Sequence, residues 1–175
     1  MDETEFTDNA LKIISGATRL AKENCNTQLT PLHFLAAMVP TDEGDQLTPY
    51  LKTLIEKGRF EWATFERTVN KHLVRLPRQE PAPDDLQPLY ATGKILKRAQ
   101  QIKAQQKDYY VAQDHLLLAL LEDLLIQSVF KDANVNVESI KQQAVSLRGL
   151  QRIDSRQADS RGAYECLNKY CVVLH

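Results

Sequence analysis

The sequence predicts an all-α protein made of two four-helix halves related by a pseudo-two-fold axis. The first observation behind this is a duplication: residues 30–38 and 112–120 share one pattern, with His33 and His115 in equivalent places, 115 − 33 = 82 residues apart. The second is that apolar residues recur at helical spacing along most of the chain, with no alternating pattern of useful strand length. An internal repeat is a stronger indication of the fold than any single predicted helix. We therefore expect eight helices around a shared core.

The 82-residue spacing also holds upstream of the two histidines. Residues 12–14 (Lys-Ile-Ile) correspond to residues 94–96 (Lys-Ile-Leu), and Leu29 corresponds to Val111. Each copy consists of an amphipathic helix, a short polar loop and a second helix that is apolar on nearly every side. A helix that is apolar all round is normally buried, so we expect the second helix of each copy at the centre of the fold.

Capping residues place the first two helices. Thr7 precedes the apolar positions of the first helix, and its hydroxyl can accept a hydrogen bond from a free N–H group of the first turn. Thr30 and Pro31 open the second helix, because a proline at the first helical position lacks an N–H that would have no partner there. This helix is predicted to run to about residue 39, and residues 42–45 are predicted to form a turn.

Prolines and glycines delimit the remaining helices of the first half. Pro49 opens the third helix, and Gly58 is predicted to be its C-terminal cap. Pro77 closes the fourth helix, after which residues 78–88 form an extended, proline-containing linker. The apolar positions of the fourth helix are Trp62, Phe65, Val69 and Leu73.

The second half repeats this order after the linker. Its buried helix is predicted at about residues 113–121, and Gly149 is predicted to stop the eighth helix. Ala133 takes the place of Gly58, but at a spacing of 133 − 58 = 75 residues, so the second half has a shorter central turn. The apolar positions of its first helix are Ile95, Leu96, Ala99 and Ile102.

The character of the chain changes after Gly149. Residues 151–161 are polar and of mixed charge, and such a segment has too little apolar surface to fold alone. We therefore expect a flexible C-terminal tail over residues 150–175, with the start of one more helix at residues 164–170. The tail has no closing motif, which suggests a piece of a longer protein that ends in a cloning remnant.

Composition excludes several classes of function. The 22 basic and 23 acidic residues nearly cancel, so the chain is not expected to bind nucleic acid or an anionic membrane surface. No apolar run reaches the roughly 18 residues of a membrane-spanning helix, and the acidic N-terminus does not resemble a signal peptide. Three cysteines fit free thiols in a reducing compartment, so the expectation is a cytoplasmic protein.

The sequence carries no catalytic or metal-binding motif. It contains no phosphate-binding G-x-x-x-x-G-K-[ST] loop, no G-x-G-x-x-G and no G-x-S-x-G. His33 and His115 each fall in the first turn of a buried helix without a second ligand three or four residues away, so both are expected to bond neighbouring backbone. No metal site is expected at Cys166, Cys171 and His175 either, since structural zinc normally has four placed ligands.

Asp108 and Asp114 flank the start of the second buried helix and admit two interpretations. They are either first-turn carboxylates favoured by the helix dipole or an acidic rim that binds a basic or N–H group of a peptide beside an apolar groove. Leu11 and Leu89 fall outside the apolar stripes of their helices, as does one of Tyr109 and Tyr110. Several such residues on one patch would indicate a binding surface.

Several short motifs, taken together, are specific to one known family. They are Phe6-Thr7, Thr-Pro-Leu-His at 30–33, Tyr-Leu-Lys-Thr-Leu-Ile-Glu-Lys-Gly-Arg-Phe at 50–60, Leu-Val-Arg-Leu-Pro at 73–77, Gln-Gln-Lys-Asp at 105–108, Ala-Gln-Asp-His at 112–115 and Arg-Ile-Asp-Ser-Arg at 152–156. The combination resembles the N-terminal domain of the Clp/heat-shock AAA+ unfoldases, and most of all that of the fungal cytosolic ClpB-type disaggregases. Residues 167–170 resemble the entry to the first ATPase module.

The resemblance implies a domain organisation and a role. Residues 1–149 would be the N-terminal domain, with repeat one at 1–77, the linker at 78–88 and repeat two at 89–149, and residues 150–175 would lead toward the ATPase module. The domain would be non-catalytic and bind no cofactor, whereas the full-length protein would be a hexameric AAA+ ATPase using ATP and Mg²⁺. Its partners would be unfolded or aggregated polypeptides, its own AAA+ ring and co-chaperones, in the cytoplasm and the nucleus.

The resemblance also implies site residues. Thr7, Asp108 and Asp114 match polar positions that matter for substrate engagement in bacterial relatives. The family has an apolar groove beside the first helix of repeat two, and the expected binding surface comprises Leu11, Ile14, Leu96, Ile102, Tyr110 and Val111.

The sequence also departs from its relatives at three positions. Arg98 and His115 stand where bacterial relatives have leucine. Leu32 stands where relatives that bind phosphorylated arginine have an acidic residue, which argues against a phosphoarginine site. The alternative is a regulatory module that docks on the first ATPase ring or a co-chaperone, which the polar tail and a solvated basic face favour.

Overall fold

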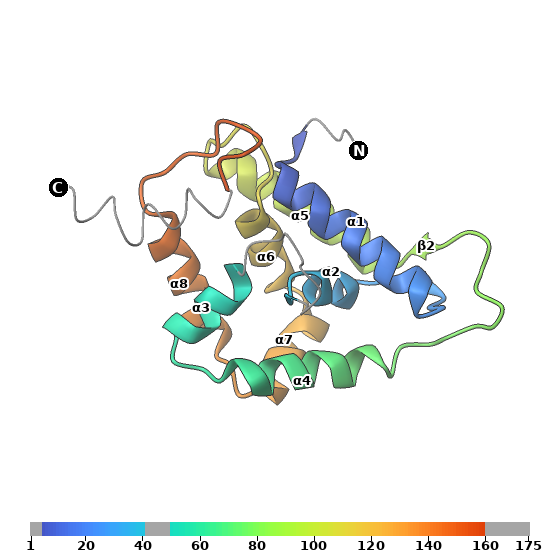
Figure 1. The fold of residues 1–175 in the computed structure, drawn as a ribbon. Coiled ribbons are helices and arrows are strands. Elements are labelled where there is room, and N and C mark those ends of the chain that lie inside the picture. The colour runs from blue at the N-terminus through green and yellow to red at the C-terminus, as the bar shows by residue number, and fades with distance from the viewer. Residues whose placement is uncertain (1–4, 41–49, 160–175) are drawn as a thin grey trace.

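The structure is a computed structural model that describes residues 5–40 and 50–159 (Figure 1). Within these residues the two halves contain four helices each, as the sequence predicts. The first half has α1 (Asp8–Glu23), α2 (Pro31–Ala37), α3 (Tyr50–Lys57) and α4 (Trp62–Leu73). The second has α5 (Tyr90–Gln105), α6 (Gln113–Leu120), α7 (Leu124–Asp132) and α8 (Val137–Arg148). The central helices α2 and α6 lie between α1 and α5 on one side and α4 on the other.

The predicted starts of α1 and α2 are confirmed, and α3 ends at Lys57, next to Gly58, as predicted. Thr7 caps α1, its Oγ1 accepting a hydrogen bond from the Ala10 N–H at 3.1 Å, and α2 begins at Pro31 after Thr30. Gly58 follows α3 without adopting a left-handed conformation; the chain reverses one residue later, at Arg59, with φ of 65°. The predicted turn at 42–45, Pro49 and the helix predicted at 164–170 lie outside the described residues.

The duplication extends to the backbone conformation. Within residues 5–40 and 50–159, four residues other than glycine have a positive φ, and they form two equivalent pairs. Cys25 (55°) and Lys107 (60°) are separated by the 82-residue spacing and follow the first helix of each half. Arg59 (65°) and Asn134 (59°) are separated by the 75-residue spacing. Equivalent turns therefore form from unrelated side chains at corresponding places in the two repeats.

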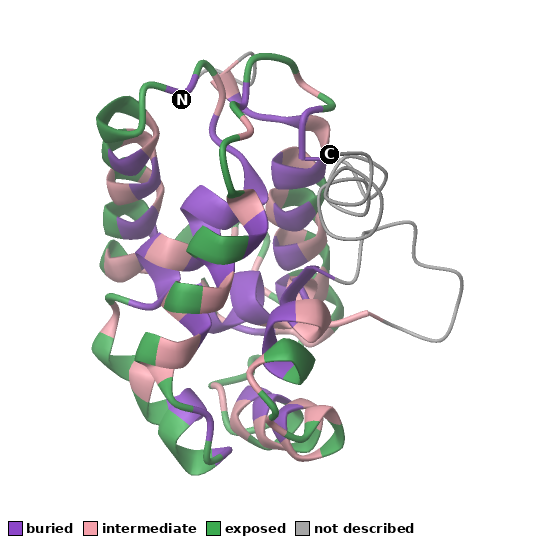
Figure 2. Ribbon diagram, turned by 90° about the vertical axis from the view of Figure 1, so that its left-hand side faces the viewer, coloured by how far each residue is buried: buried purple, intermediate pink, exposed green. Residues whose placement is uncertain are grey.

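The two halves share one hydrophobic core, which contains buried residues of every helix. Phe65 of α4 and Phe130 of α7 are fully buried and meet edge to face, with ring centroids 4.9 Å apart. Figure 2 shows the buried positions on the inward faces of the helices and the exposed positions outside. Since the core crosses the boundary between the repeats, neither half buries its apolar faces without the other.

Two short backbone bridges, which the sequence analysis did not predict, join the halves. Phe6 pairs with Val111 in a parallel bridge, and β1 (Gln28–Leu29) pairs in parallel with β2 (Gln87–Pro88) at the end of the predicted linker. The bridges are equivalent: Phe6 and Pro88 are 82 residues apart, as are Leu29 and Val111. One bridge joins the start of α1 to the end of α5, and the other joins the end of α1 to the start of α5. The two helices therefore run antiparallel to each other.

Residues 151–159, which the sequence analysis assigned to the tail, pack against both halves. The Tyr109 N–H donates to the Ile153 carbonyl (2.9 Å), and the Asp8 N–H donates to the Arg156 carbonyl (2.9 Å). Ile153 is fully buried in a small cluster with Ala112, Ala158 and Tyr110. The segment packs on surfaces that the helices form, and its own amino-acid composition gives no indication of these contacts. Among the described residues, no helix has the length and apolar character needed to cross a membrane.

Candidate functional site

The first candidate site is the surface between α1 and α5, which we define by Leu11, Ile14, Gly93 and Leu96 and call the α1–α5 surface. A hydrogen bond from Gln100 Nε2 to Glu5 Oε2 (3.3 Å) turns one flank of α5 toward the start of α1. Gly93 and Leu96 fall on the same flank as Gln100, at helical spacings of seven and four. Ile14 is the equivalent of Leu96 in the first repeat, so the pseudo-two-fold axis directs the matching flank of α1 toward α5.

Apolar atoms of this surface remain accessible to solvent. Leu11, Ile14 and Leu96 are half-buried and pack against the core from outside it. A Cβ added at Gly93 would meet no other atom within 4 Å, so there is open space next to α5 at this point. A partly exposed apolar strip that is bounded by two rigid helices is suited to contact with apolar side chains.

Two other predicted groove residues lie deeper than the sequence suggests, and a third, Tyr110, packs on a different cluster. Val111 is fully buried and Ile102 is buried, and both belong to the core cluster. Tyr110 is half-buried and packs on the cluster of Ala112, Ile153 and Ala158. Val111 also carries the bridge to Phe6. These residues support the neighbouring surface from below, and Ile102 and Val111 offer almost no area to a ligand.

Asp108 and Asp114 belong to a buried ionic network. They are 7% and 3% exposed. Arg148 of α8 donates from Nη1 to both oxygens of Asp108 (3.1 and 3.0 Å), and its Nη2 lies 2.9 Å from Asp114 Oδ2. Asp108 Oδ1 also accepts the N–H of Ile153 at 3.1 Å. The carboxylates therefore bind groups of the domain itself, and they line a hollow together with Arg148 and Leu118.

Both histidines have the structural role that the sequence predicts. The Thr30 N–H donates to Nδ1 of His33 (2.9 Å), and the Ala112 N–H donates to Nδ1 of His115 (2.8 Å). Nε2 of His33 then donates to Asn26, while Nε2 of His115 donates to Asp108. Burial lowers the pKa of His33 to about 4, against a smaller opposing effect of the bond to Thr30, so its ring is neutral at pH 7. No cluster of three or more potential metal ligands occurs within residues 5–40 and 50–159.

Thr7 is the third predicted polar residue, and it is fully buried beneath residues 151–159. Its Oγ1 donates to Asp159 Oδ2 at 2.8 Å. Asp159 Oδ2 also accepts a hydrogen bond from the backbone N–H of Gln113 (2.9 Å). Burial raises the pKa of Asp159 to about 6. The hydrogen bonds from Gln113 and Thr7 oppose this shift, and the nearby charge of Asp114 adds to it. Asp159 thus ties the end of the described chain to the starts of α1 and α6.

Sequence reasoning missed Arg148 and Asp159, which complete these two polar clusters. A basic residue in the last turn of a helix is adequately explained by the helix dipole, and Asp159 lies in a segment of mixed charge. One signal was available for Asp108. It aligns with Asn26 at the 82-residue spacing, so the repeat replaces a neutral amide with a carboxylate, and a buried carboxylate requires a cation. Of the two departures at family leucine positions, Arg98 pairs with Glu122 (2.8 Å) and His115 lies in the network.

Comparison with known proteins shows similarity along the whole chain. The family described as "Clp repeat (R) N-terminal domain" matches residues 5–127. Heat shock protein 104 of Schizosaccharomyces pombe is 34% identical over 174 residues, which is 99% of this chain and 19% of that protein. Heat shock protein hsp98 of Neurospora crassa is 34% identical over 96% of this chain and 19% of that protein. The chain therefore spans about a fifth of the length of these relatives.

Solved structures agree with the fold. The crystal structure of the Hsp104 N-terminal domain from Candida albicans is 59% identical, with a TM-score of 0.83, and the match covers 89% of this chain and 99% of that one. The N-terminal domain of ClpD from Arabidopsis thaliana is 16% identical, with a TM-score of 0.62 over 85% of this chain, and supports the fold alone.

Proposed function

The chain belongs to the Clp N-terminal domain family, and on this basis we propose that it is the non-catalytic N-terminal domain of a ClpB/Hsp104-type chaperone that engages unfolded or aggregated polypeptide. The full-length protein would be a hexameric AAA+ ATPase in the cytoplasm and the nucleus, using ATP and Mg²⁺ in its rings. Residues 1–149 would form the substrate-engaging domain, with repeats at 1–77 and 89–149 joined by 78–88, and residues 150–175 would lead toward the first ring.

The observation that carries the proposal is the accessible apolar strip on the α1–α5 surface. Leu11, Ile14 and Leu96 expose apolar atoms at the junction of the two repeats, with open space at Gly93. An unfolded polypeptide presents apolar side chains without a fixed sequence, so a shallow apolar surface suits it better than a deep, specific pocket. Contact of this kind should be weak, about micromolar or weaker, because ordering a flexible peptide opposes binding. Six tethered copies would compensate through avidity.

We assign the remaining predicted residues to supporting roles. Ile102 and Val111 fill the core beneath the surface, and Tyr110 anchors residues 151–159. Thr7, Asp108 and Asp114 set the starts of α1 and α6 through their buried contacts. Their replacement would then weaken substrate engagement by displacing these helix starts, without loss of a direct contact to the peptide.

The test is an NMR titration of the chain with a permanently unfolded polypeptide, such as reduced and carboxymethylated lactalbumin. The double variant Leu11→Ser with Leu96→Ser removes apolar area from both helices at half-buried positions. It should weaken binding at least about fivefold, in line with loss of two partly exposed apolar contacts, while the circular dichroism spectrum stays helical. Val111 is unsuitable for this purpose, because replacing a fully buried residue would disturb folding.

The control variant is Val145→Ser, which removes an exposed apolar side chain from α8. It should leave binding unchanged. Wild-type affinity in a folded Leu11→Ser, Leu96→Ser variant would refute the assignment of the α1–α5 surface. Chemical-shift changes confined to residues 150–175 would refute it as well.

A second candidate function is a docking module for the first ATPase ring or a co-chaperone. The observation that favours it is the attachment of residues 151–159 to both repeats, which anchors the described end of the chain to the domain. This function predicts that the chain binds an isolated ring or a co-chaperone but not denatured protein. Parallel pull-downs with each would separate it from the first proposal.

A further inference from the structure

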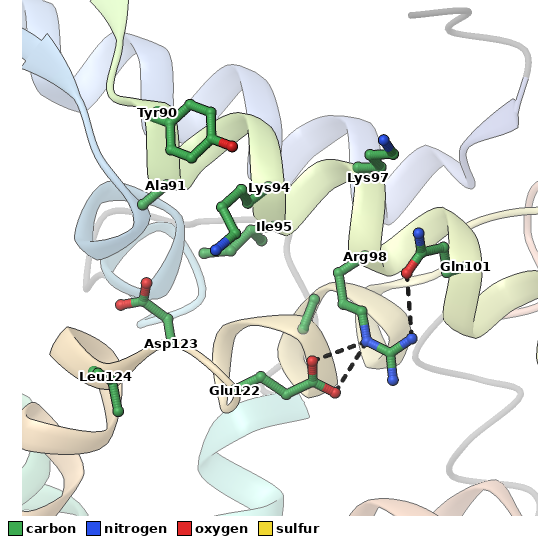
Figure 3. Close-up of a pocket in the computed structure, with 11 residues that line it drawn as sticks. Tyr90, Ala91, Lys94, Ile95, Lys97, Arg98, Gln101, Glu122, Asp123 and Leu124 are labelled. Carbon is green, nitrogen blue, oxygen red and sulfur yellow. Dashed lines mark hydrogen bonds and ion pairs between the residues drawn. The ribbon is translucent and has the colours of Figure 1, made fainter.

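A second hollow lies on the opposite flank of α5 from the α1–α5 surface. It has a volume of about 560 Å³ and is formed by α5, the end of α6 and the turn that leads into α7 (Figure 3). Ile95 and Ala119 are the buried apolar residues in its lining. The volume falls within the range of small-ligand and peptide side-chain pockets.

Two exposed apolar side chains line the edges of this hollow. Tyr90, at the start of α5, is 82% exposed, and Leu124, at the start of α7, is 80% exposed. Single exposed apolar residues are common on protein surfaces, but two beside one hollow indicate a contact site. Figure 3 shows Tyr90 and Leu124 coming from different helices on either side of the hollow. A single apolar side chain of a partner can be covered between them over Ile95.

Of the charged side chains that line the hollow, Arg98 and Glu122 pair with each other, whereas no ion pair is formed by Lys94, Lys97 or Asp123 within the described residues. Glu122 is paired with Arg98 through contacts of 2.8 and 3.1 Å, and Asp123 caps α7 by accepting the Ile126 N–H at 3.1 Å. Lys94 Nζ lies 5.9 Å from the centre of the Tyr90 ring. Within the described part of the chain, neither Lys94 nor Lys97 forms an ion pair. Two amines therefore outnumber one carboxylate without an ion pair, and the hollow carries a net positive charge toward an anionic ligand.

Comparison of the two repeats shows that folding does not require the combination of Tyr90, Lys97 and Arg98 on α5. At the 82-residue spacing, the residues of repeat one that are equivalent to Tyr90, Lys97 and Arg98 are Asp8, Ser15 and Gly16. Only Lys94 has a basic counterpart, Lys12. Both helices pack against their own central helix in the same fold, so the additional aromatic ring and cations on α5 are not needed for that packing. They make α5 basic and aromatic where α1 is not.

We propose that this hollow is a docking site for an acidic peptide segment of a partner protein, anchored by one apolar side chain. The anchor lies between Tyr90 and Leu124, and carboxylates on either side of it bind Lys94 and Lys97. The site is distinct from the α1–α5 surface because Leu96 and Arg98 point to different flanks of α5. A domain with both sites can hold a client polypeptide and a partner at the same time.

The test uses the whole 175-residue chain and a fluorescein-labelled peptide that has one tryptophan between two pairs of aspartates. A matched peptide with lysines in place of the aspartates should not bind measurably. Lys94→Glu should weaken binding of the acidic peptide at least about fivefold, and raising the salt concentration to about 0.5 M should weaken it further. The control is Lys12→Glu, the equivalent change in repeat one, which alters net charge equally and should leave binding unchanged.

A second pair of variants tests the apolar anchor. Leu124→Ser should weaken binding, whereas Val74→Ser, at a similarly exposed residue, should not. Equal effects of Lys94→Glu and Lys12→Glu would overturn the proposal, because they would indicate only long-range attraction. Competition by an oligonucleotide or by inorganic phosphate as effective as by unlabelled peptide would overturn it too. Leu11→Ser with Leu96→Ser should leave this binding intact, so failure here and failure of the proposed client function are separable.

Discussion

Asn26 and Asp108 occupy equivalent places in the two repeats, and each contacts the histidine seven residues further along the chain. Asn26 Oδ1 lies 2.8 Å from Nε2 of His33, and Asp108 Oδ2 lies 2.8 Å from Nε2 of His115. The amide leaves the first site neutral. The carboxylate of the second recruits Arg148, and through it Asp114. One change between the copies has therefore converted a local turn contact into a network that joins the α5–α6 loop, α6 and α8.

Asp108→Asn should destabilise the domain by about 2 kcal/mol, because Arg148 is then left partly buried with one carboxylate in place of two. The change is close to isosteric, so loss of charge is the main effect. Urea unfolding monitored by circular dichroism would measure it. Asp154→Asn, at an exposed carboxylate, is the matched control and should change the free energy of unfolding by less than about 0.5 kcal/mol. Equal stability of the two variants would contradict the network's role.

Asp159 should make the domain less stable as pH rises. Burial raises the pKa of its carboxyl from 3.8 to about 6 in the folded state. Between these values the folded protein binds more protons than the unfolded chain, so this stabilising contribution is complete below pH 3.8 and is lost as pH rises through about 6. Asp159→Asn removes this dependence. The free energy of unfolding of the variant, relative to that of the wild type, should therefore rise by about 2 kcal/mol between about pH 4 and pH 7.5.

The measurement for Asp159 is urea unfolding of both proteins at the two pH values. His33 has the opposite sign, since its depressed pKa makes stability fall as pH drops from 6.5 toward about 4. Both proteins retain His33, so its contribution cancels in the difference between them. A difference that does not change with pH would show that Asp159 titrates normally.

Gly93→Ala should stabilise the domain by about 0.5–1 kcal/mol, because alanine loses less backbone entropy in a helix than glycine does. The new Cβ would meet no atom within 4 Å. Thermal unfolding would register the gain as a higher Tm. A loss of stability would mean that the space beside α5 is smaller than the structure indicates, which would also weaken the case for the α1–α5 surface.

Arg59→Gly should stabilise the domain by about 1 kcal/mol, since glycine adopts the left-handed conformation without the strain of a Cβ. Asn134→Gly, at the equivalent turn, should gain less because asparagine tolerates that conformation. Gly58→Ala should destabilise, because its Cβ would lie 2.9 Å from Cε2 of Phe60. Thermal unfolding of the three variants would rank them. If Gly58→Ala were harmless and Arg59→Gly unfavourable, the turn would reverse at Gly58 after all.

Much of the architecture could be predicted from the sequence because its causes are local. The 82-residue repeat, the caps at Thr7 and Thr30 and the helical periodicity identified two copies of one unit. A helix that is apolar all round has to be buried wherever it occurs, so the central position of α2 and α6 followed. The structural role of both histidines followed as well, because each ring reaches the backbone of its own first turn.

Other features were decided only by the tertiary structure, because they depend on partners distant in sequence. Ile102 and Val111 look like groove residues until the bridge to Phe6 and the shared core bury them. Asp108 and Asp114 look like an open rim until α8 brings Arg148 within 3.1 Å. Residues 151–159 look like tail because their composition is polar, yet Ile153 and Asp159 become buried against surfaces that both repeats form together. Periodicity and capping act within a few residues, whereas burial and charge pairing depend on how the two repeats meet.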